Sequence, residues 1–154
     1  MKITRRGGTV RLRLAAAESQ TLDAVFEDLE SALAGLGPGD EVWDRLHPAA
    51  YDDAEAASEF RDLVDDDVDA QRVERIGMCR AELAQSGGDL RLAEESLDRW
   101  LVTVNDIRLA IGTRIGVTAD DDPVDPAFAE DHGRLLYGWL TWLQDALVTT
   151  AMGD

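Results

Sequence analysis

Aspartates at alternate positions near the middle of the chain are the side chains with the most obvious potential chemistry. Asp65, Asp67 and Asp69 have the spacing of the first three ligands of a calcium-binding loop. Such a loop needs a glycine at its sixth position and a bidentate glutamate at its twelfth, and here these positions hold Ala70 and Ile76. We therefore expect a solvated acidic face, and we predict no metal and no cofactor.

The two histidines offer little basis for catalysis. His47 precedes a proline and His132 stands alone, so neither has the HExxH or cysteine–histidine spacing of a zinc site. GxSxG, Walker and glycine-rich dinucleotide motifs are absent from the sequence. We therefore predict a protein that is not an enzyme and has no catalytic residues. The alternative is an enzyme whose unrecognised site combines imidazole, carboxylate and guanidinium groups: His47, Asp52, Asp53, Asp106 and Arg108.

Cys79 is the only cysteine, and therefore the only thiol that could sense oxidants. Arg75, one helical turn earlier, and the adjacent Arg80 would stabilise the reactive thiolate form. Burial would have the opposite effect and leave the thiol inert. We predict an inert Cys79, with a reactive thiol as the alternative. A single cysteine excludes an intrachain disulfide and fits a reducing compartment, so we expect a cytoplasmic protein.

Polar residues also interrupt the most apolar helical pattern of the sequence. Asn105, Asp106, Arg108 and Arg114 lie among apolar residues that recur every three or four positions. Buried polar groups need partners, which polar residues between positions 45 and 61 would supply. We expect a network of ion pairs, with a binding pocket as the alternative. The predicted members are these: Arg45, His47, Tyr51, Asp52, Asp53, Glu59, Arg61, Asn105, Asp106, Arg108 and Arg114.

Positive charge is concentrated in residues 1–13, which hold five of the fifteen basic residues and no acidic residue. The five are Lys2, Arg5, Arg6, Arg11 and Arg13. Ten basic and 32 acidic residues leave the rest of the chain at −22. Gly7-Gly8, between two short runs typical of strands, predicts a β-hairpin.

The overall charge of −17 opposes broad contact with a nucleic-acid backbone. We therefore expect weak DNA binding or none, with the hairpin arginines paired to the protein's own acidic helices or to a neighbouring subunit. The alternative is a DNA-binding regulator that inserts the basic hairpin into a groove.

Apolar periodicity predicts four main helices. They cover about 17–36, about 53–84, a stripe from 93 to 115 that follows a turn and cap at Gly87-Gly88-Asp89, and a last helix up to about 152. The run of aspartates from 65 to 69 predicts a bend or break in the second helix. The predicted fold is mainly α, a small four-helix bundle-like domain with an N-terminal β-hairpin. We expect one domain over 1–154, with the hairpin in 1–14 and the helical body in 17–152.

Several aspartates have the spacing of helix N-caps. Asp40 is predicted to cap a short turn, Asp52 to form a capping box with Glu55, and Asp125 to precede a proline at the start of the last helix. Residues 116–125 are predicted to form an acidic loop.

The last helix is apolar over a broad side. Its most apolar stretch, 135–152, contains Gln144 and Asp145 and is too short to span a bilayer, so we expect no membrane partner. Its apolar width instead predicts a homodimer through Trp139, Trp142 and neighbouring leucines.

Three stretches carry a resemblance to a known family over nearly the whole chain. They are 45–53 (RLHPAAYDD) with Glu59-Phe60-Arg61, 105–117 (NDIRL followed by GTRIGV), and 137–144 (YGWL followed by LQ). Together they resemble the actinobacterial AosR-like oxidative-stress transcriptional regulators, formerly a family of unknown function and often encoded beside the Clp adaptor.

The resemblance implies a cytosolic regulator that acts on transcription by binding another protein, from the transcription machinery or Clp-related. It also implies a link to thiol supply. A switch based on an intrachain disulfide needs two cysteines, and this sequence has only Cys79. A redox switch here would need sulfenylation, a mixed disulfide or a bond between subunits.

Overall fold

The computed structural model describes residues 1–47, 54–118 and 131–153, and for residues 54–66 it describes only the backbone. The elements in chain order are β1 (Lys2–Arg6), β2 (Thr9–Arg13), α1 (Ala16–Gly35), α2 (Glu41–Leu46), α3 (Ala54–Ser86), β3 (Asp89–Leu92), α4 (Glu94–Arg114) and α5 (His132–Met152). The predicted fold class, mainly helical with an N-terminal hairpin, is confirmed.

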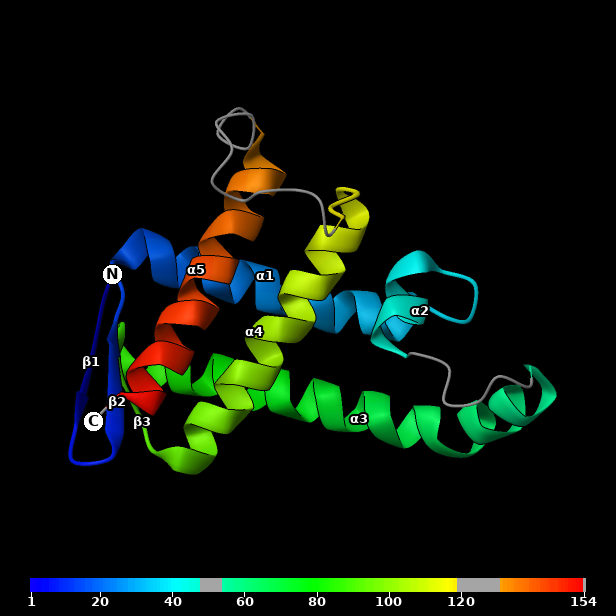
Figure 1. Cartoon of the computed structure of the whole chain (residues 1–154), viewed down its shortest axis with the longest axis horizontal. Coiled ribbons are helices and arrows are strands. Elements are labelled where there is room, and N and C mark those ends of the chain that lie inside the picture. The colour runs from blue at the N-terminus through cyan, green and yellow to red at the C-terminus, as the bar shows by residue number, and fades with distance from the viewer. Residues whose placement is uncertain (48–53, 119–130, 154) are drawn as a thin grey trace.

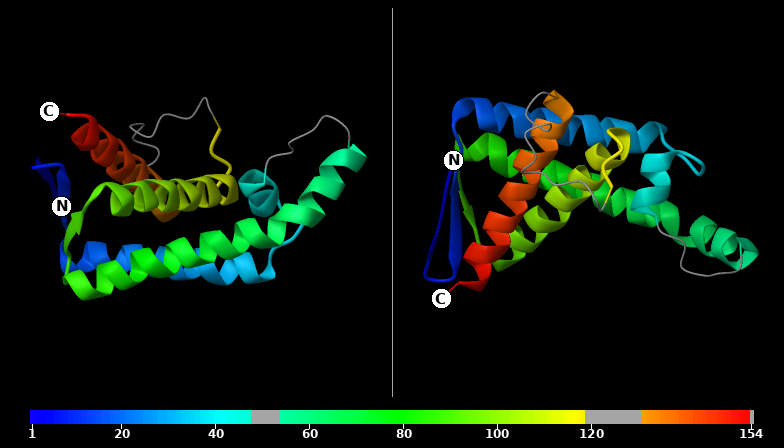
Figure 2. Two further views of the ribbon diagram at one scale, coloured as in Figure 1. Left: turned by 90° about the horizontal axis from the view of Figure 1, so that it is seen from below. Right: turned by 45° about the horizontal axis from the view of Figure 1, so that its top comes forward.

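The helices form two layers. Helix α1 packs along α3, and α4 and α5 lie across this pair as a second layer (Figures 1 and 2). The small sheet closes one end of the molecule, and α2 lies at the other end against α4. In the described part of the chain, none of the helices has the length and apolar character needed to cross a membrane.

The hairpin forms as predicted, but its sheet has a third strand. β1 and β2 pair antiparallel around Gly7 and Gly8, whose φ angles of 58° and 82° favour glycine. β3 pairs antiparallel with the other edge of β2. The predicted helix cap at Asp89 is therefore wrong, because Asp89 begins a strand and α4 starts after Ala93. Leu90 and Leu92 alternate inward with a period of two, a pattern too short in four residues to be distinguished from a helix start.

The ends of α1, α3 and α4 agree with the periodicity to within about two residues, whereas α5 begins at His132, later than the start predicted after Asp125. Asp40 caps α2 as predicted, accepting hydrogen bonds from the backbone nitrogens of Val42 and Trp43. Asp131 caps α5, which begins at His132. The predicted caps at Asp52 and Asp125, and most of the predicted acidic loop 116–125, lie outside the described residues.

α3 passes through the aspartate run 65–69 as one continuous helix, so the predicted break is absent. A bend remains, because the N-terminal part of α3 is inclined away from the rest in both views of Figure 2.

The core lies between the two helical layers and the inner face of the sheet. Phe26 of α1 and Trp100 of α4 meet edge to face, with ring centroids 5.5 Å apart. Both side chains are fully buried, and the Trp100 indole N–H donates a 2.6 Å hydrogen bond to Glu82 of α3. These contacts join α1, α3 and α4 and hold the face of α4 that carries the polar residues described next.

Candidate functional site

A network of charged and polar side chains joins α2, α3 and α4. It centres on His47, which follows α2 and is 5% exposed. The imidazole stacks on Trp43 with ring centroids 4.0 Å apart, and its Nδ1 lies 2.8 Å from the Trp43 carbonyl oxygen. Its Nε2 lies 2.8 Å from Oδ1 of Asp69 and 3.3 Å from Nη1 of Arg72, so α3 holds the imidazole from the other side.

Asp106 of α4 is the buried carboxylate of this network. Nε of Arg72 lies 3.5 Å from its Oδ2, and Nη2 of Arg75 donates to the same oxygen at 3.3 Å. Burial raises the pKa of Asp106, while the two arginines oppose this shift. Arg72 also donates to the carbonyl oxygen of Leu46. Arg72 therefore links all three helices.

The predicted network is only partly the one observed. His47 and Asp106 both belong to it, but their described partners, Asp69, Arg72 and Arg75, were not among its predicted members. These three α3 residues are three positions apart and share one side of the helix, and this spacing is the signal that could have identified them. Tyr51, Asp52 and Asp53, together with the side chains of Glu59 and Arg61, lie outside the described residues.

The remaining predicted members lie elsewhere. Asn105 accepts a long hydrogen bond of 3.5 Å from Gln144 of α5. Arg114 is exposed at the end of α4. Arg45 and Arg108 line a separate cavity, and the described lining of that cavity includes neither His47 nor Asp106. The described groups of the alternative enzyme site therefore do not converge on this cavity.

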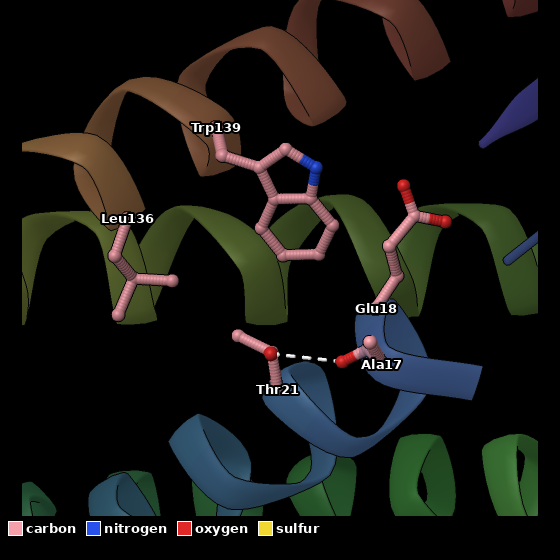
Figure 3. A pocket seen from close by; sticks show the side chains of 5 residues that line it. All are labelled: Ala17, Glu18, Thr21, Leu136 and Trp139. Carbon is pink, nitrogen blue, oxygen red and sulfur yellow. Dashed lines mark hydrogen bonds between the residues drawn. The ribbon is translucent and has the colours of Figure 1, made fainter. Parts of the chain in front are cut away.

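A larger cavity of about 380 Å³ lies between the start of α1 and the N-terminal half of α5. Leu136 and Trp139 of α5 face Ala17, Glu18 and Thr21 of α1 across it (Figure 3). Thr21 donates its hydroxyl hydrogen to the Ala17 carbonyl oxygen, so that donor is already used within α1. The lining offers mainly apolar surface, with a single carboxylate at its edge.

Cys79 lies on α3 where this helix faces α4, and its side chain is fully buried. Its thiol is 3.6 Å from the hydroxyl of Thr103. Burial raises the pKa of Cys79 to about 11 and outweighs the opposing effect of Arg75 and Arg99. The thiol is therefore almost entirely protonated at neutral pH, the form that reacts poorly with oxidants.

The basic residues of the hairpin have several environments. Arg11 forms a two-pronged ion pair with Asp89 of β3, which accepts from Nε at 2.7 Å, and Nε of Arg13 lies 3.6 Å from the same carboxylate. The hydrogen bond from Arg11 is the main reason that the pKa of Asp89 falls to about 2. Arg5 donates to the backbone carbonyl oxygen of Gly153. The carboxylate that pairs with Arg11 and Arg13 thus comes from the sheet and not from an acidic helix.

The register places a further cation beside the hairpin. Arg91 of β3 lies opposite Arg11 and is exposed. This residue was not predicted to belong to the basic cluster, because β3 itself was not recognised. Within the described part of the chain, no group of three or more histidine, cysteine or acidic side chains is placed to hold a metal ion.

The sequence matches one family model and several curated relatives. The family model described as Domain of unknown function (DUF2017) matches residues 1–151. The putative oxidative stress regulator AosR of Mycobacterium leprae is 34% identical over 115 residues, which are 71% of this chain and 51% of the relative. The oxidative stress regulator AosR of Mycobacterium tuberculosis is 32% identical over 114 residues, 70% of this chain and 50% of the relative.

The chain spans about half the length of these curated relatives. No solved structure matches the chain significantly. The match over residues 1–151 shows that the chain, which is similar to mycobacterial proteins named oxidative stress regulators, belongs to the DUF2017 family.

Proposed function

We propose that this chain is a non-enzymatic, cytoplasmic regulator of the oxidative-stress response that acts by binding another protein. The names of its relatives support the regulatory role. The observation that carries the mode of action is the charge on the outer face of the three-stranded sheet, and we propose this face as the docking surface.

Strand register defines this outer face. Val10, Leu12, Leu90 and Leu92 point into the core and are at most 2% exposed. Side chains alternate along a strand, so the neighbouring residues point outward. The outward charged residues are Lys2, Arg6, Arg11, Arg13, Asp89 and Arg91. Five cations and one carboxylate therefore share one face of a protein whose overall charge is −17.

An acidic segment of another protein, from the transcription machinery or a Clp-related protein, is the partner that this face fits best. Outside the sheet, nine basic and 31 acidic residues give the chain a charge of −22. A long polyanion such as DNA would meet this negative body beyond the sheet, whereas a short acidic segment would contact the sheet alone. Asp89 already neutralises part of the charge of Arg11 and Arg13, which leaves Lys2, Arg6 and Arg91 as the more available cations.

The described part of the alternative enzyme site supports a structural role for its residues. His47 and Asp106 are held by the same arginine, Arg72, in a network that joins three helices. The imidazole and the carboxylate that could act as a general base are therefore already engaged in ion pairs and hydrogen bonds.

The proposal is tested by reversing charge on the outer face in a bacterium that encodes this chain. A deletion strain is complemented with the natural gene, with Arg6→Glu/Arg91→Glu, or with Arg114→Glu as the control for charge away from the sheet. We expect the double variant to fold, by circular dichroism, but to fail to restore survival in peroxide, while Arg114→Glu restores it. Full restoration by the double variant would show that this face does not carry the function.

DNA binding by the hairpin is the competing mode. A mobility shift with promoter DNA that persists at about 150 mM salt and is lost in Arg5→Ala/Arg6→Ala would establish it. We expect any shift to disappear at that salt concentration, because the three available cations of this face offer few phosphate contacts and the rest of the chain repels phosphate.

A further inference from the structure

A second cavity, of about 220 Å³, lies where α2, the C-terminal half of α4 and α5 approach one another. α2 packs beside this half of α4 in Figures 1 and 2. Arg45 of α2 and Arg108 of α4 both line the cavity, and its described lining contains no aspartate or glutamate. In so acidic a chain, two arginines at a cavity whose described lining holds no carboxylate need a physical explanation.

Four arginines of α3 and α4 have carboxylate partners. Arg72 and Arg75 share Asp106, Arg80 pairs with Asp23 and Glu30, and Arg99 pairs with Glu82. Arg45 and Arg108, in contrast, form no ion pair with any residue that the structure describes. The exposed Arg114 likewise has no ion pair with a described residue, but Arg45 and Arg108 are the two that lie together at one cavity.

Arg108 also carries an unmet polar atom. Its Nε is buried and has no hydrogen-bond acceptor among the described residues. The Nε atoms of Arg72, Arg75 and Arg99 are likewise unmet, but the terminal nitrogens of those three arginines contact carboxylates, whereas Arg108 has no such contact with a described residue. A planar guanidinium group matches the oxygens of a carboxylate or phosphate better than any neutral acceptor does.

The wall of the cavity is tightly built. A Cβ added to Gly112 would come within 2.9 Å of Cε2 of Tyr137, so the glycine is needed for the ring of α5 to pack against α4 here. Thr113, which also lines the cavity, donates its hydroxyl hydrogen to the Leu109 carbonyl oxygen. The two arginines are the charged donors of the lining, Thr118 and Tyr137 contribute hydroxyl groups, and Leu109 and Val117 add apolar surface.

We propose that this cavity binds the oxyanion group, a phosphate or a carboxylate, of a small molecule. Arg45 and Arg108 supply the charge and the paired N–H donors, and the apolar wall accommodates a short carbon chain. Such a ligand would join α2 to α4, in addition to the ion pairs of Arg72. The site is separate from the sheet, so it stands or falls independently of the proposed docking face.

The test is calorimetric titration of the purified full chain with inorganic phosphate and, separately, with succinate, at constant ionic strength. We expect saturable binding of at least one anion with a Kd of about 1 mM or tighter. Binding of phosphate alone would identify a phosphorylated ligand, and binding of succinate alone would identify a carboxylate ligand. Saturation by neither anion up to tens of millimolar would overturn the proposal.

Three variants separate a specific site from general attraction to positive charge. Arg108→Gln and Arg45→Gln are each expected to weaken binding at least about tenfold, because each removes one charged guanidinium group with its paired N–H donors. Arg114→Gln removes the same charge from an exposed position on α4 and is expected to change the Kd less than about twofold. An equal loss in Arg114→Gln would contradict the site. If Arg108→Gln unfolds, Arg45→Gln, on the exposed side of α2, still decides the question.

Discussion

Arg72 shows how one side chain can serve several elements at once. It donates to the carbonyl oxygen of Leu46, lies 3.3 Å from the imidazole of His47, and shares Asp106 with Arg75. Removing the charge of Asp106 would leave both arginines without the carboxylate that they share. The loss should exceed that of an exposed pair, because solvent screens these partly buried groups poorly.

Asp106→Asn is therefore expected to lower the free energy of unfolding by about 2 kcal/mol. Asn keeps the size of the side chain and can still accept a hydrogen bond, but it cannot neutralise two guanidinium groups. Urea unfolding followed by circular dichroism measures the change. Asp98→Asn, on an exposed part of the same helix, is the control and should change stability by less than about 0.5 kcal/mol. Equal effects of the two substitutions would show that the network contributes little.

Cys79 is expected to resist oxidation in the folded protein. With its pKa raised to about 11, only about one thiol in ten thousand is ionised at pH 7. Mass spectrometry after mild peroxide treatment should find Cys79 unmodified, and Cys79→Ser should bind partners as the natural chain does. Rapid, specific modification of Cys79 that alters partner affinity would instead establish it as an oxidant sensor.

The same raised pKa has a consequence for stability at alkaline pH. The thiol ionises near its ordinary pKa of 9.0 in the unfolded chain and near about 11 in the folded chain. Its contribution to stability is therefore fully present below pH 9 and is lost as the pH rises toward about 11. Urea unfolding across this range should show a steeper loss of stability in the natural chain than in Cys79→Ala, whose residue 79 does not titrate.

At the scale of elements, the turn before β3 determines whether the third strand joins the sheet. Gly88 has a φ of 90°, and an added Cβ would lie 2.7 Å from the backbone oxygen of Leu14. The backbone N–H of Leu14 donates to the Gly88 oxygen at 2.7 Å, so the two segments cannot easily separate. Gly87 also has a positive φ, of 59°, but faces open space.

Gly88→Ala should therefore destabilise the protein by about 3 kcal/mol, which combines backbone strain with displacement of Leu14. Gly87→Ala should cost only the strain, about 1 kcal/mol. Parallel urea unfolding curves of the two variants measure the difference. Similar urea midpoints for the two variants would mean that the close approach of Gly88 to Leu14 adds nothing to the cost of the substitution.

At the scale of the whole molecule, α5 leaves apolar side chains exposed. Leu135 is 47% exposed, Trp142 51% and Met152 80%, whereas Trp139 turns toward α1 and lines a cavity (Figure 3). Positions 135 and 142 are two turns apart and so lie on one side of the helix. This exposed side, and not Trp139, is the part of the predicted dimer surface that remains available.

We expect the chain to be a homodimer at micromolar concentration, with Trp142 at its centre. Trp142→Glu should give a monomer in multi-angle light scattering, since a buried unpaired carboxylate opposes association. Val102→Glu, at a position of α4 that is 44% exposed, is the control and should remain dimeric. A monomeric natural chain at that concentration would rule out this interface.

Local pattern alone was enough to identify most elements. The positions of α1 and of the body of α4 follow from apolar residues every three or four positions, because burying one side of a helix requires that spacing. The hairpin follows from Gly7-Gly8, and the start of α2 from Asp40, since each depends on interactions within a few residues. The charge difference between the first thirteen residues and the rest is likewise a property of sequence alone.

Contacts between distant segments depended on the tertiary structure. β3 has only four residues and becomes a strand because β2 offers it a pairing edge, which then adds Arg91 to the basic face. The partners of Asp106 come from α3, because packing places one of the several charged sides of that helix against α4. The same packing buries Cys79, and the joining of α2, α4 and α5 brings Arg45 and Arg108 to one cavity. A sequence pattern records which side of a helix is apolar, but only packing determines which polar groups meet across it.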